Sequence, residues 1–138
     1  KDLCAFSVIV STCAMAGKLY NIGIPENHFD MIVLDEAGYA WEAETMACIR
    51  GQRKGRLILA GDHKQLSPTT MNPDAGKKGL ELSMMERLSS TCQLYKRRGN
   101  TGYDPRFITK LVRCYRCHPS IIAVPNELFY DNELIPSG

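Results

Sequence analysis

Two short apolar runs that end on acidic residues constrain the fold of this chain more than any other feature. Residues 31–34 (MIVL) are followed by Asp35 and Glu36, and residues 57–60 (LILA) are followed by a glycine and Asp62. The apolar residues in each run are continuous and do not alternate with polar ones. This pattern is typical of strands buried on both faces, as in a parallel sheet covered by helices.

Other segments supply further candidate strands and helices. Two more apolar runs, 6–13 and 107–112, are predicted as strands. The helical patterns cover residues 41–49, 83–88 and 118–129. The order of strands and helices predicts an α/β fold of the βαβ type.

Local signals mark where some of these elements begin and end. Ser83 and Glu86 have the spacing of a capping box at a helix start. Pro125 lies inside the last helical pattern, where we expect it to break the helix or to begin a second one. Glycine and proline in residues 68–79 predict a loop.

Composition limits the possible functions without choosing one. The chain has 138 residues, 44% hydrophobic and 23% charged, which fits about one globular domain. A net charge of +2 is too small to indicate a nucleic-acid-binding protein by itself. Basic residues concentrate between positions 94 and 116, namely Lys96, Arg97, Arg98, Arg106, Lys110, Arg113 and Arg116. From charge alone, a solvated loop face is the favoured interpretation of this run.

The six cysteines are irregularly spaced, which argues against a disulfide framework and favours a reducing, intracellular setting. No leader pattern opens the chain, and no apolar run reaches the ~18 residues that a membrane span requires. The stretch CYRCH, residues 114–118, has the spacing of a haem c attachment site. A zinc site would use the same two sulfurs but needs a second ligand pair.

Polar residues follow the predicted strands at the edge where α/β sheets bind ligands. Ser11 and Thr12, Asp35 and Glu36, and Asp62 all occupy such positions. Two adjacent carboxylates repel each other and lose water, a cost that a divalent cation relieves. Alternatively, Glu36 is only a favourable charge near the start of the next helix.

The order of the motifs resembles that of superfamily 1 helicases. The segments are VIVSTC, MIVLDEAG, LILAGDHKQLSPT, SMMERL, LVRCYRCHPSI and NELFYDNEL. The resemblance covers nearly the whole chain. It is closest to the RNA helicases that include the nonsense-mediated-decay helicase and, nearer still, the Armitage type of RNA silencing. It implies a RecA-like parallel sheet flanked by helices, and a cytoplasmic, ATP- and Mg²⁺-dependent enzyme that moves on single-stranded RNA.

The resemblance also implies roles for individual residues around the nucleotide. Asp35 and Glu36 resemble the Walker B carboxylates, with Asp35 holding Mg²⁺ through a water and Glu36 accepting a proton from the attacking water. Gln65, in the pattern GDxxQL, resembles the amide that senses the γ-phosphate, and Asp62 organises the same loop. Arg116, in the pattern YRxHP, resembles the arginine that reaches the γ-phosphate.

Contacts to nucleic acid are implied in the same way. Ser11 and Thr12 resemble the motif that touches the nucleic-acid backbone. Pro68 and Thr69 lie where relatives approach the single strand. Association with Argonaute or Piwi proteins of the piRNA pathway is implied only by the resemblance to Armitage-type helicases.

Three residues depart from the family pattern. CYRCH is better interpreted as YRxHP with two incidental cysteines, since relatives usually have an amide at the position of Cys114 and Ser or Met at that of Cys117. We therefore expect neither haem nor zinc. Tyr39 stands where the family commonly has glutamine (DEAGQ), which puts the coupling between ATP and RNA in doubt.

The phosphate-binding pattern G-x-x-x-x-G-K-[ST] is absent from these residues. We therefore expect an internal fragment, with residues 1–113 from the first RecA-like domain and residues 114–138 forming a hinge and the start of the second. Alone, it should not hydrolyse ATP, and measurable RNA-dependent turnover would refute this expectation. Two alternatives remain: a DNA-directed helicase of the same superfamily, or a non-catalytic scaffold derived from a helicase.

Overall fold

The structure is a computed structural model that describes residues 3–99 and 102–137. The chain divides into two compact units, Lys1–Cys92 and Gln93–Gly138. In the first unit the elements are η1 (Leu3–Ala5), α1 (Cys13–Ala16), η2 (Leu19–Ile22), β1 (Met31–Leu34), α2 (Glu42–Ile49), β2 (Arg56–Leu59), α3 (Pro73–Ala75), η3 (Gly76–Leu80) and α4 (Met84–Thr91). In the second they are η4 (Gln93–Tyr95), β3 (Arg113–Cys114), α5 (Pro119–Phe129) and β4 (Ile135–Pro136).

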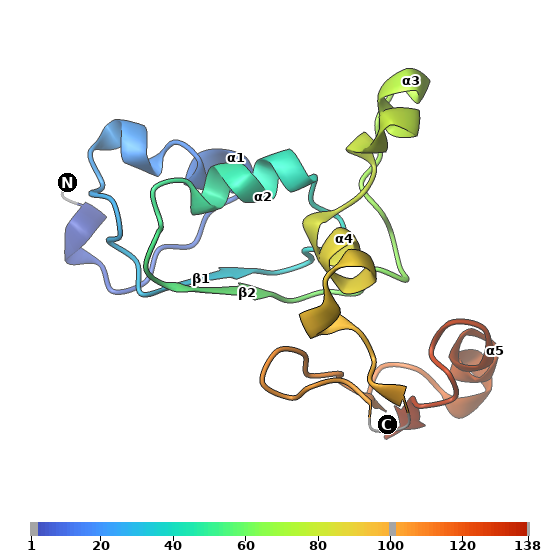
Figure 1. Cartoon of the computed structure of the whole chain (residues 1–138). Coiled ribbons are helices and arrows are strands. Elements are labelled where there is room, and N and C mark those ends of the chain that lie inside the picture. Colours follow the sequence, from blue (N-terminus) through green and yellow to red (C-terminus); the bar gives the residue numbers. More distant parts are fainter. Residues whose placement is uncertain (1–2, 100–101, 138) are drawn as a thin grey trace. The chain divides into compact units, whose positions relative to one another are not determined.

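The first unit is built on a parallel pair of strands, β1 and β2, which are adjacent along their whole length (Figure 1). Leu34 lies opposite Leu59 at the carboxyl end of the pair. The hydrogen-bond ladder continues beyond the strands, because Ala60 N donates to Leu34 O at 2.8 Å and Ala37 N donates to Ala60 O at 2.8 Å. Both predicted strands are confirmed, with the second beginning one residue earlier than expected.

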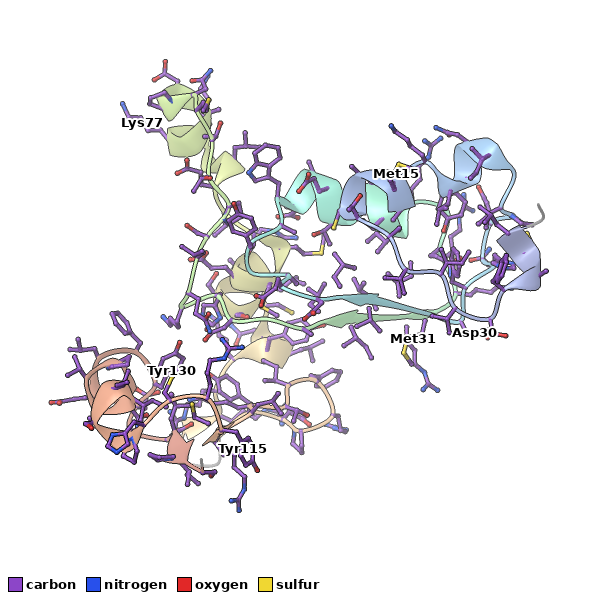
Figure 2. The ribbon with its side chains drawn as sticks, turned by 180° about the vertical axis from the view of Figure 1, so that it is seen from behind. Met15, Asp30, Met31, Lys77, Tyr115 and Tyr130 are labelled. Carbon is purple, nitrogen blue, oxygen red and sulfur yellow. The ribbon has the colours of Figure 1, made fainter. Side chains whose placement is uncertain are left out.

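Helices cover one side of this strand pair. Helices α1 and α2 contact each other and lie along the same side of β1 and β2 (Figure 1). The buried apolar residues of the unit are Ile24, Leu34, Ala37, Cys48 and Met84. The Met31 side chain extends on the opposite side of the sheet (Figure 2) and is 44% exposed. The prediction that both faces are buried is therefore wrong for the described residues.

Helix α4 begins where the sequence predicts. The Ser83 hydroxyl accepts a hydrogen bond from Glu86 N at 3.1 Å, which is one half of the expected capping box. Arg87 then donates from Nε and Nη2 to the Glu42 carboxylate, at 2.7 and 2.6 Å. This two-pronged ion pair joins α4 to the first turn of α2.

Two predicted strands are not formed. Residues 6–13 and 107–112 lie outside the strands. Val10 and Leu111, which belong to these two runs, are apolar and highly exposed. A strand needs a neighbouring strand to accept and donate its backbone hydrogen bonds. Residues 6–13 have no such neighbour among the described residues, and residues 107–112 meet one only at their end, where Val112 O accepts the Ile135 N–H at 2.8 Å. In the second unit the strand pairing instead joins Arg113 and Cys114 to β4.

Two smaller expectations are also corrected. Pro125 does not end a helix but lies inside α5, which runs uninterrupted from Pro119 to Phe129. Proline removes only one donor, so flanking helical hydrogen bonds can carry the helix past it. The predicted loop at residues 68–79 contains the short helix α3 and part of η3.

The fold class is thus mixed helix and strand, with short two-stranded parallel sheets. A RecA-like sheet of more strands and the domain boundary expected after residue 113 stay predictions. None of the helices in the described part of the chain has the length and apolar character needed to cross a bilayer.

Candidate functional site

The candidate site lies at the carboxyl edge of β1 and β2. Asp35 and Glu36 follow β1 directly, and Asp62 follows β2 after two residues. Because the two strands are parallel, both segments leave the sheet at the same edge. This is the edge at which open α/β sheets bind their ligands.

Two glycines allow the two loops to touch at the level of the backbone. A Cβ atom on Gly61 would lie 2.9 Å from Ala37 N, and Gly61 also has a φ of 149° that favours glycine. A Cβ atom on Gly38 would lie 2.9 Å from Asp62 O. Only the absence of both side chains lets the segment 35–38 pack against the segment 60–63.

The Asp35 and Glu36 carboxylates stand on a tight turn. Glu36 has φ 52°, in the left-handed region that residues other than glycine rarely adopt. Asp35 Oδ1 accepts the Glu36 N–H at 3.1 Å, and Glu36 O accepts the Tyr39 N–H at 2.9 Å. Both acidic side chains are exposed. The turn therefore presents two carboxylates to solvent at the edge of the sheet, with local strain of the kind often found at functional sites.

Asp62 organises the second loop. Its Oδ1 accepts the Lys64 N–H at 2.9 Å, and its Oδ2 accepts a hydrogen bond from Gln65 Nε2 at 2.9 Å. The carboxylate accepts hydrogen bonds only, so it selects the orientation in which the amide nitrogen of Gln65 faces Asp62. Gln65 itself is exposed. These bonds tie the Asp62 side chain to its own loop, and its role at a nucleotide site stays a prediction.

The structure therefore brings the loops of four predicted residues together: Asp35, Glu36, Asp62 and Gln65. Arg116 belongs to the second unit, where its side chain is exposed.

The predicted nucleic-acid contacts lie in different surroundings. Thr12 accepts the Met15 N–H at 3.4 Å and caps α1, and Ser11 beside it is exposed. Pro68 is fully buried, whereas Thr69 is exposed. The exposed hydroxyls of Ser11, Thr12 and Thr69 can thus contact a nucleic-acid backbone, while the ring of Pro68 shapes the loop from within.

The basic run of the second unit is largely neutralised by acidic partners. Arg97 pairs with Asp131 at 3.2 Å and with Glu133 at 2.9 Å, and Lys110 pairs with Glu133 at 2.6 Å. Arg98 pairs with Asp104 at 3.3 Å.

Asp104 is the acidic centre of this unit. Its carboxylate receives two hydrogen bonds from the Arg106 guanidinium, at 3.0 and 2.7 Å, and an ion pair from Arg98 at 3.3 Å. The hydrogen bonds from Arg106 lower the pKa of Asp104 from 3.8 to about 2. Nothing in the composition of the basic run singles out Asp104. Its position two residues before an arginine was the available signal.

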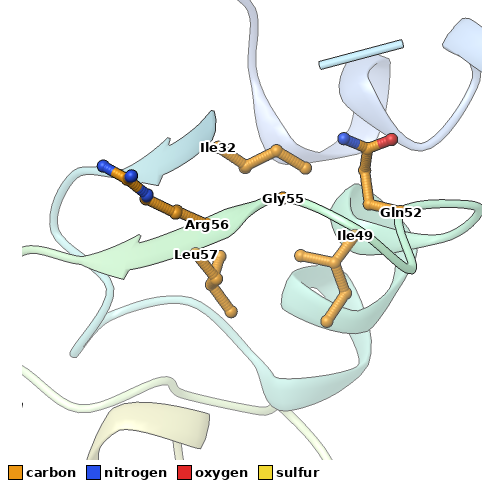
Figure 3. Close-up of a pocket in the computed structure, with 6 residues that line it drawn as sticks. All are labelled: Ile32, Ile49, Gln52, Gly55, Arg56 and Leu57. Carbon is orange, nitrogen blue, oxygen red and sulfur yellow. The ribbon is translucent and has the colours of Figure 1, made fainter. Parts of the chain in front are cut away.

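A small hollow lies at the opposite edge of the sheet from the two loops (Figure 3). It measures about 80 Å³, and its lining residues are Ile32, Ile49, Gln52, Gly55, Arg56 and Leu57. Pockets for small organic ligands usually measure ~300 to 1,000 Å³, so this hollow is too small for a nucleotide. Among the described residues, no group of three or more His, Cys, Asp or Glu side chains lies close enough to hold a metal ion by itself.

Comparison with known proteins defines the class first. Residues 3–73, which include both loops, match the AAA domain family, and the chain belongs to this family.

Individual relatives then specify the kind of AAA protein that the chain resembles. It is 49% identical to the Danio rerio protein mov-10-B.1, named as a helicase, over 97% of this chain and 13% of that protein. It is 39% identical to RNA helicase Mov10l1 of Mus musculus and 36% identical to Probable RNA helicase armi of Drosophila melanogaster. Each of these two matches covers 94% of this chain and 11% of the relative. The resemblance to Armitage-type RNA helicases is confirmed.

Proposed function

We propose that this chain is part of the motor core of an ATP-dependent RNA helicase that moves along and unwinds RNA. The observation that carries the proposal is the backbone contact between the Asp35–Glu36 turn and the loop from Gly61 to Gln65. The chain spans about an eighth of the relatives it matches, so the activity is proposed for the longer protein.

Asp35 and Glu36 divide the chemistry between them. An exposed carboxylate directly after a strand fits Mg²⁺, which prefers oxygen ligands and keeps several waters. Asp35 would hold the metal through such a water. Bound Mg-ATP supplies the phosphoryl group and neutralises its charge. Glu36 would accept the proton of the attacking water, for which its exposed position at the sheet edge suits it.

Gln65 and Arg116 would act on the γ-phosphate. The hydrogen bond from Gln65 Nε2 to Asp62 fixes the orientation of the amide, which supports a sensing role. Arg116 would stabilise charge on the transferring group, because the planar guanidinium matches phosphate oxygens. An arginine in this role contributes ~10³ to 10⁵ in rate.

RNA contacts would come from exposed hydroxyl groups. Ser11, Thr12 and Thr69 are the candidates, and Pro68 would position the Thr69 loop from its buried site. Such contacts to the sugar-phosphate backbone do not read sequence, so binding should tolerate many RNA sequences.

The test is ATP hydrolysis by the full-length natural chain that contains these residues. Glu36→Gln should lower RNA-stimulated turnover by ~10² to 10⁴ and leave nucleotide binding intact, because it removes only the proton acceptor. Glu44→Gln, the same change on α2 outside the two loops, should leave turnover unchanged. Equal turnover in both variants would contradict the proposed site.

A non-catalytic scaffold is the second candidate, which Tyr39 favours because a phenol replaces the amide of the family pattern. The two candidates differ in whether Glu36→Gln changes turnover. Comparing RNA and DNA oligonucleotides of one sequence tests for recognition of the 2′-hydroxyl. An association with Argonaute or Piwi proteins, and a cytoplasmic location, stay predictions that follow from the same resemblance.

A further inference from the structure

Two cysteines flank the turn that carries Arg116. Cys114 is the last residue of β3, and its carbonyl accepts the Ser137 N–H at 2.8 Å. Cys117 directly precedes His118, the residue that caps α5. Both thiols are partly buried and free. The strand on one side and the helix on the other thus hold the two sulfurs at the ends of a four-residue turn.

The spacing of the two cysteines is fixed by the elements on either side. Only two residues separate Cys114, at the end of β3, from Cys117, next to the cap of α5, and this is the Cys-X-X-Cys spacing of thiol pairs that form disulfides. Hydrogen bonding from the backbone of Cys117 and of Arg116, with a smaller contribution from the positive charge of Arg116, lowers the pKa of Cys114 and favours its thiolate.

A second pair of neighbouring cysteines in the same chain has the opposite character. Cys48 Sγ donates to Cys13 O at 3.4 Å, which places these residues of α2 and α1 side by side. Burial raises the pKa of Cys48 to about 12, so this thiol stays protonated and unreactive near neutral pH. Cys13 and Cys48 therefore serve as an internal control for the reactivity of Cys114 and Cys117.

We propose that Cys114 and Cys117 form a redox-sensitive dithiol that hydrogen peroxide closes into an intramolecular disulfide. The Cys114 thiolate attacks one peroxide oxygen, and the O–O bond breaks. The sulfur becomes a sulfenic acid and the leaving oxygen departs as water after taking a proton. The Cys117 thiol then attacks this sulfur and releases a second water. Two thiols are oxidised and one hydrogen peroxide is reduced to two waters.

A disulfide between Cys114 and Cys117 would affect Arg116, because Arg116 lies between them. Closing the ring between Cys114 and Cys117 restricts the backbone of the two residues between them. Tyr115, one of these two, is 69% exposed and points away from the unit (Figure 2). This leaves Arg116 as the functional candidate in the ring. If Arg116 acts on the γ-phosphate, oxidation lowers ATP turnover; this consequence alone rests on the proposed function.

The experiment treats the full-length natural chain with hydrogen peroxide and follows each cysteine by differential alkylation and peptide mass spectrometry. The peptide spanning residues 114–117 should lose two hydrogen atoms, at a rate at least about tenfold above oxidation of Cys13 or Cys48. Dithiothreitol should reverse the change.

Two variants separate the steps. In Cys117→Ser, the sulfenic acid of Cys114 should accumulate and react with dimedone, because the resolving thiol is gone. In Cys48→Ser, the rate at residues 114–117 should be unchanged. Oxidation of Cys114 no faster than that of Cys48, or pairing of Cys114 with any thiol other than Cys117, would overturn the proposal. Disulfide formation without a fall in ATP turnover would leave the dithiol standing and refute only the role of Arg116.

Discussion

Replacing Gly61 by alanine tests whether the contact between the two loops holds the candidate site together. Two costs add at this position. The φ of 149° lies where residues other than glycine are strained, at a cost of about 1 to 3 kcal/mol. The new methyl group would also lie 2.9 Å from Ala37 N and 3.2 Å from Gly38 N, which are backbone atoms and cannot rotate away. Overpacking of this kind costs about 1 to 3 kcal/mol.

Two other glycines separate these costs. Gly79 has φ 94° but no atom within 4 Å of an added Cβ, so Gly79→Ala carries the backbone strain alone. Gly38 is not in the left-handed region, yet its added Cβ would lie 2.9 Å from Asp62 O, so Gly38→Ala carries the clash alone. Relative to the starting chain, Gly61→Ala should lose about 3 kcal/mol of unfolding free energy, and each of the other two about half as much.

Urea denaturation followed by tryptophan fluorescence measures these differences. Trp41 is the only tryptophan of the chain and precedes α2 in the first unit, so its emission reports on the unit that contains both loops. If Gly61→Ala proves no less stable than Gly79→Ala, the loops are not held in backbone contact and the reasoning about the site fails.

Two further predictions concern charge and coupling. Asp104 has a folded-state pKa of about 2 against an ordinary value of 3.8, chiefly because Arg106 donates hydrogen bonds to it. The folded state therefore binds fewer protons, so this stabilisation is complete above pH 3.8 and is lost as the pH falls toward 2. Acid titration of circular dichroism should show that Asp104→Asn removes this part of the pH dependence; an unchanged acid transition would contradict the assignment. Tyr39→Gln in the full-length natural chain should raise RNA-stimulated ATP hydrolysis, and an unchanged rate would count against a coupling role for position 39.

The elements that could be predicted from the sequence are those that depend on local patterns. The strands β1 and β2 are each predicted by four consecutive apolar residues. The start of α4 is predicted by Ser83, whose hydroxyl bonds to Glu86 N only three residues further along the chain. The contact between the loops that carry Asp35 and Asp62 also followed, since parallel strands place their carboxyl ends at one edge. These features need no knowledge of distant contacts.

The features that could not be predicted depend on partners. Residues 6–13 have the composition of a strand, but a strand exists only where another one is available to pair with it. The burial of Pro68 and the clearance required at Gly61 likewise depend on what packs against them. The spacing of residues along the chain does not contain that information.

The basic run shows why this distinction matters for the proposed function. Arg97, Arg98, Arg106 and Lys110 all have carboxylate partners within the second unit. A cation already paired with a carboxylate releases few counterions from a nucleic acid, because the partner's negative charge repels the phosphates. The count of basic residues is therefore weak support for RNA binding. The proposed helicase function does not depend on the number of basic residues. It depends on the backbone contact between Ala37 and Gly61, and it would fail if these two residues were apart.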